Sequence, residues 1–177
     1  MITTLLFMTG MASALSPIAP PKPSPVQISM FNALQVRHEA PTCESLAKMS
    51  ESVADDLLWL IQNTKSPPWV GIRAAQCVIR EHTEAKADTI DTWVTDPQYK
   101  GLAVLTFGLL DELPESVAMR FATLALEGPM AEDARKRLID STHPTVANLV
   151  KQTDVPTPQP DATPTPTDDA DSVDPSE

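Results

Sequence analysis

Apolar positions recur with helical spacing through most of the chain between residues 42 and 153. The stretch at 66–82, SPPWVGIRAAQCVIREH, opens on proline and places Trp69, Ile72, Ala75 and Ile79 three or four residues apart. This spacing puts the four side chains on one face of an α-helix. Proline suits the first turn of a helix, because its missing N–H leaves no hydrogen bond unmade there. The pattern predicts a helix over 67–82 with this stripe against the core.

Most of the stretch between residues 42 and 153 has the same helical character, and no segment alternates like a strand. Thr42, Ser50 and Asp96 stand where they can cap the helices that follow them, and Glu127-Gly128 stands where a helix can stop. The chain is therefore expected to be all-α. The predicted helices span 43–49, 51–63, 67–82, 84–95, 97–111, 114–126, 129–141 and 144–150.

Three of the predicted helices begin in the same way and recur at a nearly constant spacing. Pro68, Pro97 and Pro129 each stand midway through a helix pair and are 29 and 32 residues apart. Self-similarity at this spacing is typical of helical solenoids, in which each pair covers the apolar face of its neighbour. The helix over 97–111 is apolar all round, whereas its counterparts carry a single stripe, so we expect the middle helix to be enclosed.

The stretches SPPWVGIRAAQCVI, TDPQYKGLAVLTFGLL and GPMAEDARKRLI resemble the second helices of HEAT-type repeats, of the armadillo/HEAT class. In that family a turn containing Asp or Pro is followed by Arg and small residues. The resemblance covers about residues 51–141, and it implies a short right-handed solenoid of about three helix pairs that binds proteins along one face. It also implies a contact between Asp96 and Arg73. Arg73, Arg80 and Lys100 become the first candidates for partner contact; an exposed, solvated face is their alternative role.

The N-terminal segment has the features of an export signal. A short apolar run from Leu5 to Ala12 leads into Ala12-Ser13-Ala14, a small-x-small pattern at which a signal peptidase could cut after Ala14. No Lys or Arg precedes the run, so an apolar N-terminal tail is the alternative. The run is too short to span a bilayer, and no cysteine follows it closely. We expect residues 1–14 to be a signal peptide, and the protein to be periplasmic or extracellular, with no membrane span in the mature chain and no lipid anchor.

Composition divides the rest of the chain into three parts. Residues 15–41 contain six prolines and few patterned apolar residues, which predicts an extended linker. Residues 42–153 carry the helical pattern and are long enough for one compact domain. Residues 154–177 consist largely of Pro, Thr and Asp, with seven acids and no Lys or Arg, which predicts a disordered acidic tail.

The chain has two cysteines, Cys43 and Cys77. In an oxidising compartment two cysteines in a small domain favour one disulfide. The alternative is a pair of unpaired thiols, one of them buried as a small apolar side chain. The prediction of a disulfide and the prediction of export therefore depend on one another.

The charge of the chain argues against nucleic acid as a ligand. The formal net charge is −11, and residues 42–153 alone carry 16 acids against 11 basic residues, whereas phosphate binding requires clustered Lys and Arg. The densest basic cluster is Arg135-Lys136-Arg137. It is expected either to lie on a solvated face in the C-terminal half of its helix or to bind an anion, for which the acidic tail is a candidate.

The sequence offers no catalytic or cofactor motif. It contains no Gly-x-Ser-x-Gly, no Cys/His signature and no glycine-rich phosphate loop, and its three histidines have no zinc-ligand spacing. The expected function is a non-catalytic module that binds another protein. The alternative is a structural tether that acts through its tails, and an enzyme is the third class.

Overall fold

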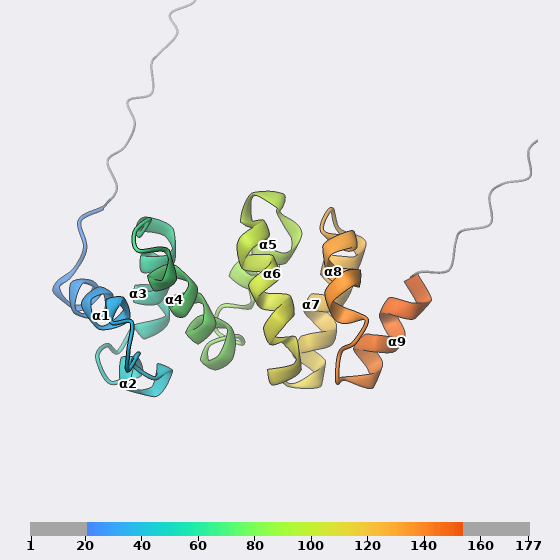
Figure 1. Cartoon of the computed structure of the whole chain (residues 1–177), viewed down its shortest axis with the longest axis horizontal. Coiled ribbons are helices and arrows are strands. Elements are labelled where there is room, and N and C mark those ends of the chain that lie inside the picture. Colours follow the sequence, from blue (N-terminus) through green and yellow to red (C-terminus); the bar gives the residue numbers. More distant parts are fainter. Residues whose placement is uncertain (1–20, 154–177) are drawn as a thin grey trace, which may run out of the picture. The chain divides into compact units, whose positions relative to one another are not determined.

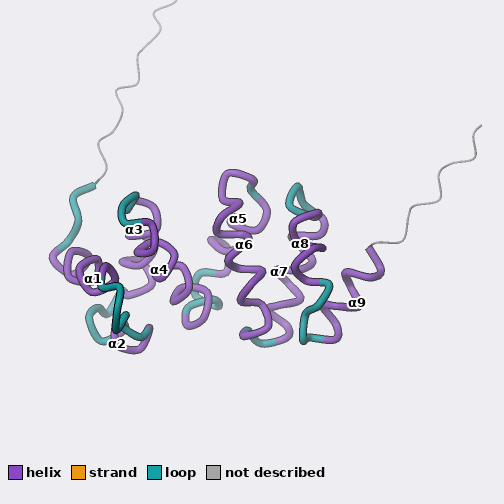
Figure 2. The backbone as a smooth tube through the Cα atoms, viewed as in Figure 1, coloured by secondary structure: helices purple, strands orange, loops and turns teal. Residues whose placement is uncertain are grey.

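The computed structural model describes residues 21–153, and every regular element in that range is helical (Figures 1 and 2). The predicted signal peptide and the predicted acidic tail lie outside the described residues. The chain forms two compact units, Met1–Ala87 and Asp88–Glu177. We call them the N-terminal and the C-terminal unit. The sequence predicted one domain over 42–153. It predicted neither the division of the chain into two units nor a helix before residue 42.

In its described part, residues 21–87, the N-terminal unit contains four helices, and its core lies where three of them meet. The helices are α1 (Pro25–Gln35), α2 (Cys43–Ala47), α3 (Val53–Asn63) and α4 (Pro68–Glu81). Helix α3 packs along α4, and α1 packs against both. The fully buried large side chains of this unit are Met30, Leu34, Leu46, Leu57, Leu60, Val70, Val78 and Ile79.

Helix α1 corrects the prediction that residues 15–41 are an extended linker. Ser24 caps the helix, because its hydroxyl accepts a hydrogen bond from the backbone N–H of Gln27 while the Gln27 side chain accepts one from the N–H of Ser24. Pro25 occupies the first turn, where proline is tolerated. Met30 and Leu34 are fully buried. A short helix therefore lies in a segment whose prolines predicted an extended chain.

Helix α4 presents a different face to the core from the one predicted. Ala75 and Ile79 are buried as expected, but Ile72 is 49% exposed and Trp69 only half-buried. The buried surface is completed instead by Val70, Ala74, Cys77 and Val78. These residues are apolar too, so the sequence pattern permitted both faces, and the packing of α1 and α3 decided between them.

The predicted helix caps are present at two of three positions. Thr42 accepts a hydrogen bond from Ser45 N–H at the start of α2, and Asp96 accepts one from Gln98 N–H. Ser50 was expected to cap α3, but Ser52 is the residue before its first turn, and the Ser50 hydroxyl donates instead to Asp56.

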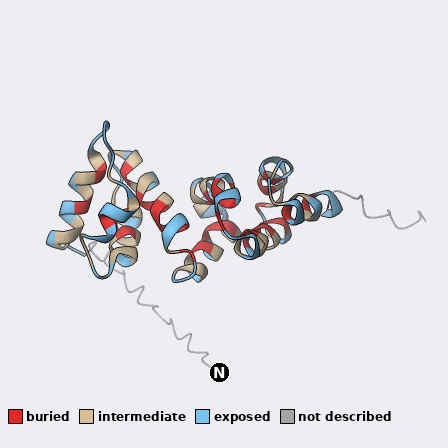
Figure 3. Cartoon of the chain, turned by 90° about the horizontal axis from the view of Figure 1, so that it is seen from below, coloured by how far each residue is buried: buried red, intermediate tan, exposed pale blue. Residues whose placement is uncertain are grey.

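The C-terminal unit contains the remaining helices and has its own core. It comprises α5 (Ala87–Thr95), the short 3₁₀ helix η1 (Pro97–Tyr99), α6 (Lys100–Leu109), a second 3₁₀ helix η2 (Leu110–Glu112), α7 (Glu115–Glu127), α8 (Ala131–Leu138) and α9 (Pro144–Thr153). Helix α7 packs against α8 and α9, and α6 packs against α8. Figure 3 shows buried residues along the inner faces of these helices, among them Phe107, Phe121, Leu138, Val146 and Val150.

Helix α6 was expected to be enclosed on all sides, and it is not. Ala103, Thr106, Phe107 and Leu109 are buried, whereas Leu102, Val104 and Leu105 are only half-buried and Gly101 and Gly108 are exposed. Gly101 and Gly108 have no side chain to bury, so the side of α6 on which they lie can face solvent although most residues of the helix are apolar. No helix within residues 21–153 is long and apolar enough to cross a membrane.

Candidate functional site

A cavity with polar and charged lining residues lies between α2 and α4 in the N-terminal unit. The cavity has a volume of about 460 Å³. One wall comes from the segment that leads into α2, and the other comes from one face of α4. The lining residues are Leu34, Ala40, Pro41, Thr42, Cys43, Glu44, Arg73, Gln76, Cys77, Arg80 and Glu81.

The two cysteines form a disulfide in the wall of this cavity. Cys43 is the first residue of α2, Cys77 lies within α4, and their Cα atoms are 5.3 Å apart. This is the pairing that the sequence predicted. Cys77 is only 4% exposed, whereas Cys43 is half-buried. The bond therefore joins the two walls of the cavity, and both cysteines line it.

Arg73 is positioned by the backbone of α1. Its guanidinium donates to the carbonyl oxygens of Leu34, at 2.8 Å, and of Val36, at 2.5 Å. These carbonyls lie at the end of α1, where a helix lacks N–H partners and carries partial negative charge. Arg73 was predicted to contact a partner protein and Asp96. The Arg73 guanidinium binds carbonyl oxygens of the N-terminal unit. The Asp96 carboxylate accepts a hydrogen bond from the Gln98 N–H within the C-terminal unit.

Trp69 reinforces the contact that Arg73 makes with α1. Its indole N–H, one helical turn before Arg73, donates to the Gln35 carbonyl at 3.2 Å. The Arg37 guanidinium lies over the Trp69 ring, 4.7 Å from its centre, which is cation–π geometry. Sequence reasoning missed this cluster because it placed residues 15–41 outside the folded part.

Positive and negative side chains balance around the cavity. Arg73 and Arg80 from α4 oppose Glu81 from the same helix and Glu44 from α2. The Glu44 carboxylate binds the Lys48 ammonium at 2.8 Å. Arg80 is exposed and takes part in an interaction within the chain. The sequence predicted Arg73 and Arg80 on one helix. In the structure both arginines line the same cavity as the disulfide.

Lys100, the third predicted contact residue, belongs to the C-terminal unit. Its ammonium lies 2.6 Å from the Asp133 carboxylate, which links α6 to α8. The hydrogen bond from Lys100 holds the pKa of Asp133 below its ordinary value. Lys100 therefore has a role in packing that the sequence did not predict.

The predicted basic cluster on α8 is partly neutralised by its own helix. Lys136 donates to Glu132 one turn earlier, at 2.5 Å. This hydrogen bond lowers the pKa of Glu132 and raises that of Lys136. Arg137 is exposed, and Arg135 is half-buried and interacts with neighbouring groups. The acidic tail proposed as its ligand lies outside the described residues.

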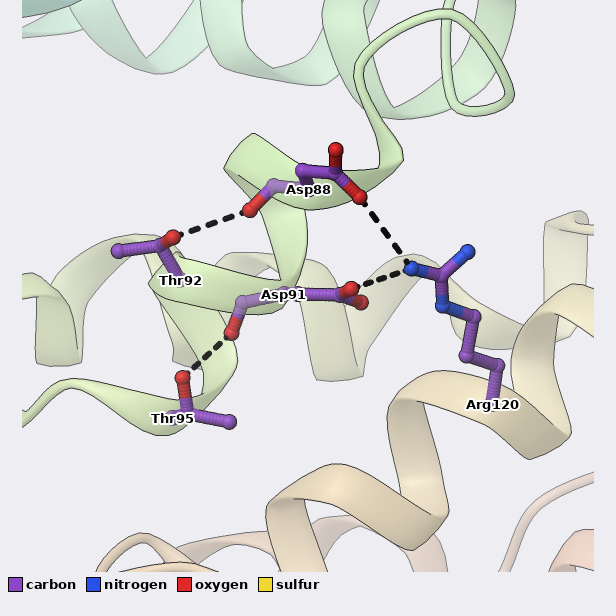
Figure 4. Close-up of polar contacts among 5 residues, drawn as sticks. All are labelled: Asp88, Asp91, Thr92, Thr95 and Arg120. Carbon is purple, nitrogen blue, oxygen red and sulfur yellow. Dashed lines mark hydrogen bonds and ion pairs between the residues drawn. The ribbon is translucent and has the colours of Figure 1, made fainter.

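A further polar cluster joins α5 to α7 and was not predicted (Figure 4). The Arg120 guanidinium of α7 binds the Asp91 carboxylate and lies 3.6 Å from that of Asp88. Thr92 and Thr95 donate their hydroxyl protons to the carbonyls of Asp88 and Asp91, four residues earlier. Because all of these groups bind within the C-terminal unit, the cluster fixes α5 on α7.

A second, smaller cavity lies between α1 and α3. It has a volume of about 260 Å³, and Phe31, Trp59 and Leu60 form its apolar part. Lys65, Thr64 and Asn63 form part of its polar edge. The sequence did not predict this cavity, for the same reason as the Trp69 cluster, because α1 supplies part of its wall through Gln27, Ile28 and Phe31.

No group of three or more His, Cys, Asp or Glu side chains within residues 21–153 is arranged to hold a metal ion. Of the histidines, His143 has its ring Nε2 3.2 Å from the Leu110 carbonyl oxygen. Comparisons of the chain with protein-family models, with curated proteins and with solved structures find no match. The candidate site is therefore described from the geometry of the cavity between α2 and α4 alone.

Proposed function

We propose that this protein is an exported, non-catalytic module that binds another protein, and that the cavity between α2 and α4 is its recognition site. The observation that carries the proposal is the cavity of about 460 Å³, which gathers Arg80, Gln76 and Glu81 beside the disulfide. A surface of this size with both signs of charge suits a peptide segment of a partner rather than a small ion. A carboxylate of that segment would bind Arg80 in competition with the group that Arg80 already contacts in the chain.

Export is supported by the disulfide. Such bonds persist in oxidising compartments and are rare in the cytosol, and Cys43 and Cys77 are joined. The composition of residues 1–14 favours the same conclusion. We therefore propose the periplasm or the outside of the cell as its location.

The HEAT-like architecture is part of the proposal. Its support is the spacing of Pro68, Pro97 and Pro129 together with two pairs of adjacent helices, one in each unit. Helix α3 packs against α4 in the N-terminal unit, and α7 packs against α8 in the C-terminal unit. Binding rather than catalysis is favoured by the polar groups of the cavity. Arg73 holds backbone carbonyls, and Glu44 holds Lys48, so both serve the fold.

The test is capture of partners by the oxidised chain from an envelope extract of the native source. The Arg80→Glu variant reverses the accessible charge of the cavity, and Arg137→Glu, on exposed α8 surface, is the matched control. We expect a partner that the native chain and Arg137→Glu retain and that Arg80→Glu loses.

Equal capture by all three proteins would contradict a role for the cavity. Loss of the partner on deletion of residues 154–177, with no effect of Arg80→Glu, would indicate a tether that acts through its tail. Circular dichroism of each variant shows whether its helices are intact, so that a loss of binding is not mistaken for a loss of fold.

A further inference from the structure

The disulfide cross-links α2, which belongs to one wall of the cavity, to α4, which forms the other wall. Helix α2 has five residues, and helices of this length are not stable by themselves in water. Its one fully buried side chain is Leu46, while Glu44, Ser45 and Ala47 are exposed. Within the described chain, α2 is thus held by Leu46, by the Thr42 cap and by the bond from Cys43 to Cys77.

The two cysteine residues line the same cavity and differ in exposure. Cys43 is half-buried, whereas Cys77 is 4% exposed. Because Cys43 is the more exposed residue, we expect a thiolate that enters the cavity to attack the sulfur of Cys43. Since the attacking thiolate must approach one sulfur while the other leaves, Cys77 is the leaving group.

The side chains around Cys77 favour its departure as a thiolate. Arg73 and Arg80 stand four residues before and three residues after Cys77, on the same face of α4, and both line the cavity with it. Cationic groups stabilise a thiolate. Glu44 and Glu81 line the same cavity, and Arg80 has an interaction within the chain. The assistance that we expect therefore comes from the position of Arg73 and Arg80 beside Cys77 on α4, and not from an excess of positive charge.

We propose that the Cys43–Cys77 disulfide is a thiol–disulfide exchange site for dithiol reductants, and that its reduction releases α2 and dismantles the cavity. The placement of the exchange site rests on the geometry alone. The consequence for partner binding rests on the proposed function, because α2 and the segment before it form one wall of the recognition site.

The exchange balances with one dithiol. A thiolate of the reductant attacks the sulfur of Cys43, the bond to Cys77 breaks, and its electron pair goes to Cys77, which takes up a proton. The mixed disulfide at Cys43 is then attacked by the second thiol of the reductant. Cys43 leaves as a thiolate and is protonated, and the dithiol is oxidised to a disulfide.

The first experiment measures the rate at which dithiothreitol reduces the full chain without denaturant, by alkylation of the new thiols and mass spectrometry. We expect a rate proportional to the dithiothreitol concentration, because the bond is attacked in the folded protein. A rate that is independent of concentration and equal to the rate of global unfolding would overturn the proposal.

The second experiment tests the charges around Cys77. Arg80→Gln should slow reduction about two- to threefold, because the leaving thiolate loses part of its stabilisation, and Arg80→Lys should restore the rate. Arg137→Gln, on α8, is the control and should leave it unchanged. If Arg80→Gln and Arg137→Gln react at the native rate, Arg80 does not assist the exchange and the proposed site is wrong.

The third experiment separates the release of α2 from partner binding. Hydrogen exchange of the reduced chain should show loss of protection at residues 40–48 with protection of α3 and α4 retained; unchanged protection at 40–48 would contradict the release. If α2 is released but the oxidised and reduced chains capture the same partners, the proposed recognition site is wrong while the exchange site stands.

Discussion

The side chains of Arg73 and Trp69 join α4 to the end of α1. They are one helical turn apart and donate to the carbonyls of Leu34, Val36 and Gln35. These carbonyls have no N–H partner within α1, and a positive charge beside them is favourable. Two residues of α4 therefore fix where α1 ends and where the segment toward Cys43 begins.

Arg73→Gln should lower the free energy of unfolding by about 2 kcal/mol, because it removes hydrogen bonds from a charged donor and leaves carbonyls with weaker partners. Urea unfolding monitored by circular dichroism measures the change. Arg137→Gln, on the exposed surface of α8, should cost less than about 0.5 kcal/mol. Equal effects of the two substitutions would show that Arg73 contributes no more than a surface residue.

Glu39 is the one residue other than glycine with a positive φ in the described chain, at 59°. A side chain in this left-handed region is unfavourable by about 1 kcal/mol, whereas glycine adopts it freely. Glu39→Gly should therefore raise the midpoint of urea unfolding, despite the added freedom of the unfolded chain. Glu84→Gly, in another turn, lacks this compensation and should not raise it. A lower midpoint for Glu39→Gly would contradict the backbone argument.

At the scale of elements, Asp111 of η2 organises the turn between α8 and α9. Its carboxylate accepts hydrogen bonds from the Ser141 hydroxyl, at 2.6 Å, and from the Thr142 N–H, at 3.1 Å. Burial acts to raise the pKa of Asp111, but these hydrogen bonds outweigh it and hold the pKa below its ordinary value. The charged form of Asp111 therefore stabilises the folded state.

This lowered pKa predicts an acid-dependent loss of stability in the C-terminal unit. The stabilisation is fully present above about pH 4, the ordinary range for an aspartate, and is lost as the pH falls from there through the lower folded value. Asp111→Asn should reduce stability at pH 7 and flatten the decline below pH 4. Urea unfolding at a series of pH values tests this, and a decline as steep in Asp111→Asn as in the native chain would assign it to other carboxylates.

At the scale of the whole molecule, the disulfide is expected to stabilise one of the two units and not the other. Cys43 and Cys77 are 34 residues apart and both lie in the N-terminal unit. A cross-link over this separation stabilises by about 3–4 kcal/mol in the chain-entropy account. That stabilisation belongs to the unit in which the loop closes.

Cys43→Ala/Cys77→Ala should therefore destabilise the N-terminal unit by about 3 kcal/mol and leave the C-terminal unit nearly unchanged. Hydrogen exchange with mass spectrometry in moderate urea distinguishes the two, because peptides from α3 and α4 report on one unit and peptides from α7 and α8 on the other. A uniform loss of protection would show that the two units unfold together.

The sequence by itself determined what depends on neighbours along the chain. Helical periodicity, proline in first turns and the caps at Thr42 and Asp96 follow from local backbone hydrogen bonding, which is why the all-α content and most helix boundaries could be predicted. The same applies to part of the site. Arg73, Cys77 and Arg80 share a face because they lie on one helix, and two cysteines allow one disulfide.

Only the tertiary structure decided what depends on residues far apart in sequence. Helix α1 is stable because Met30 and Leu34 are buried against α3 and α4, and no local pattern announces that surface. The same contacts chose which apolar face of α4 is buried and exposed Ile72. They also gave Arg73 carbonyl partners 37 and 39 residues away. Burial and charge pairing depend on which surfaces meet, and local spacing does not specify that.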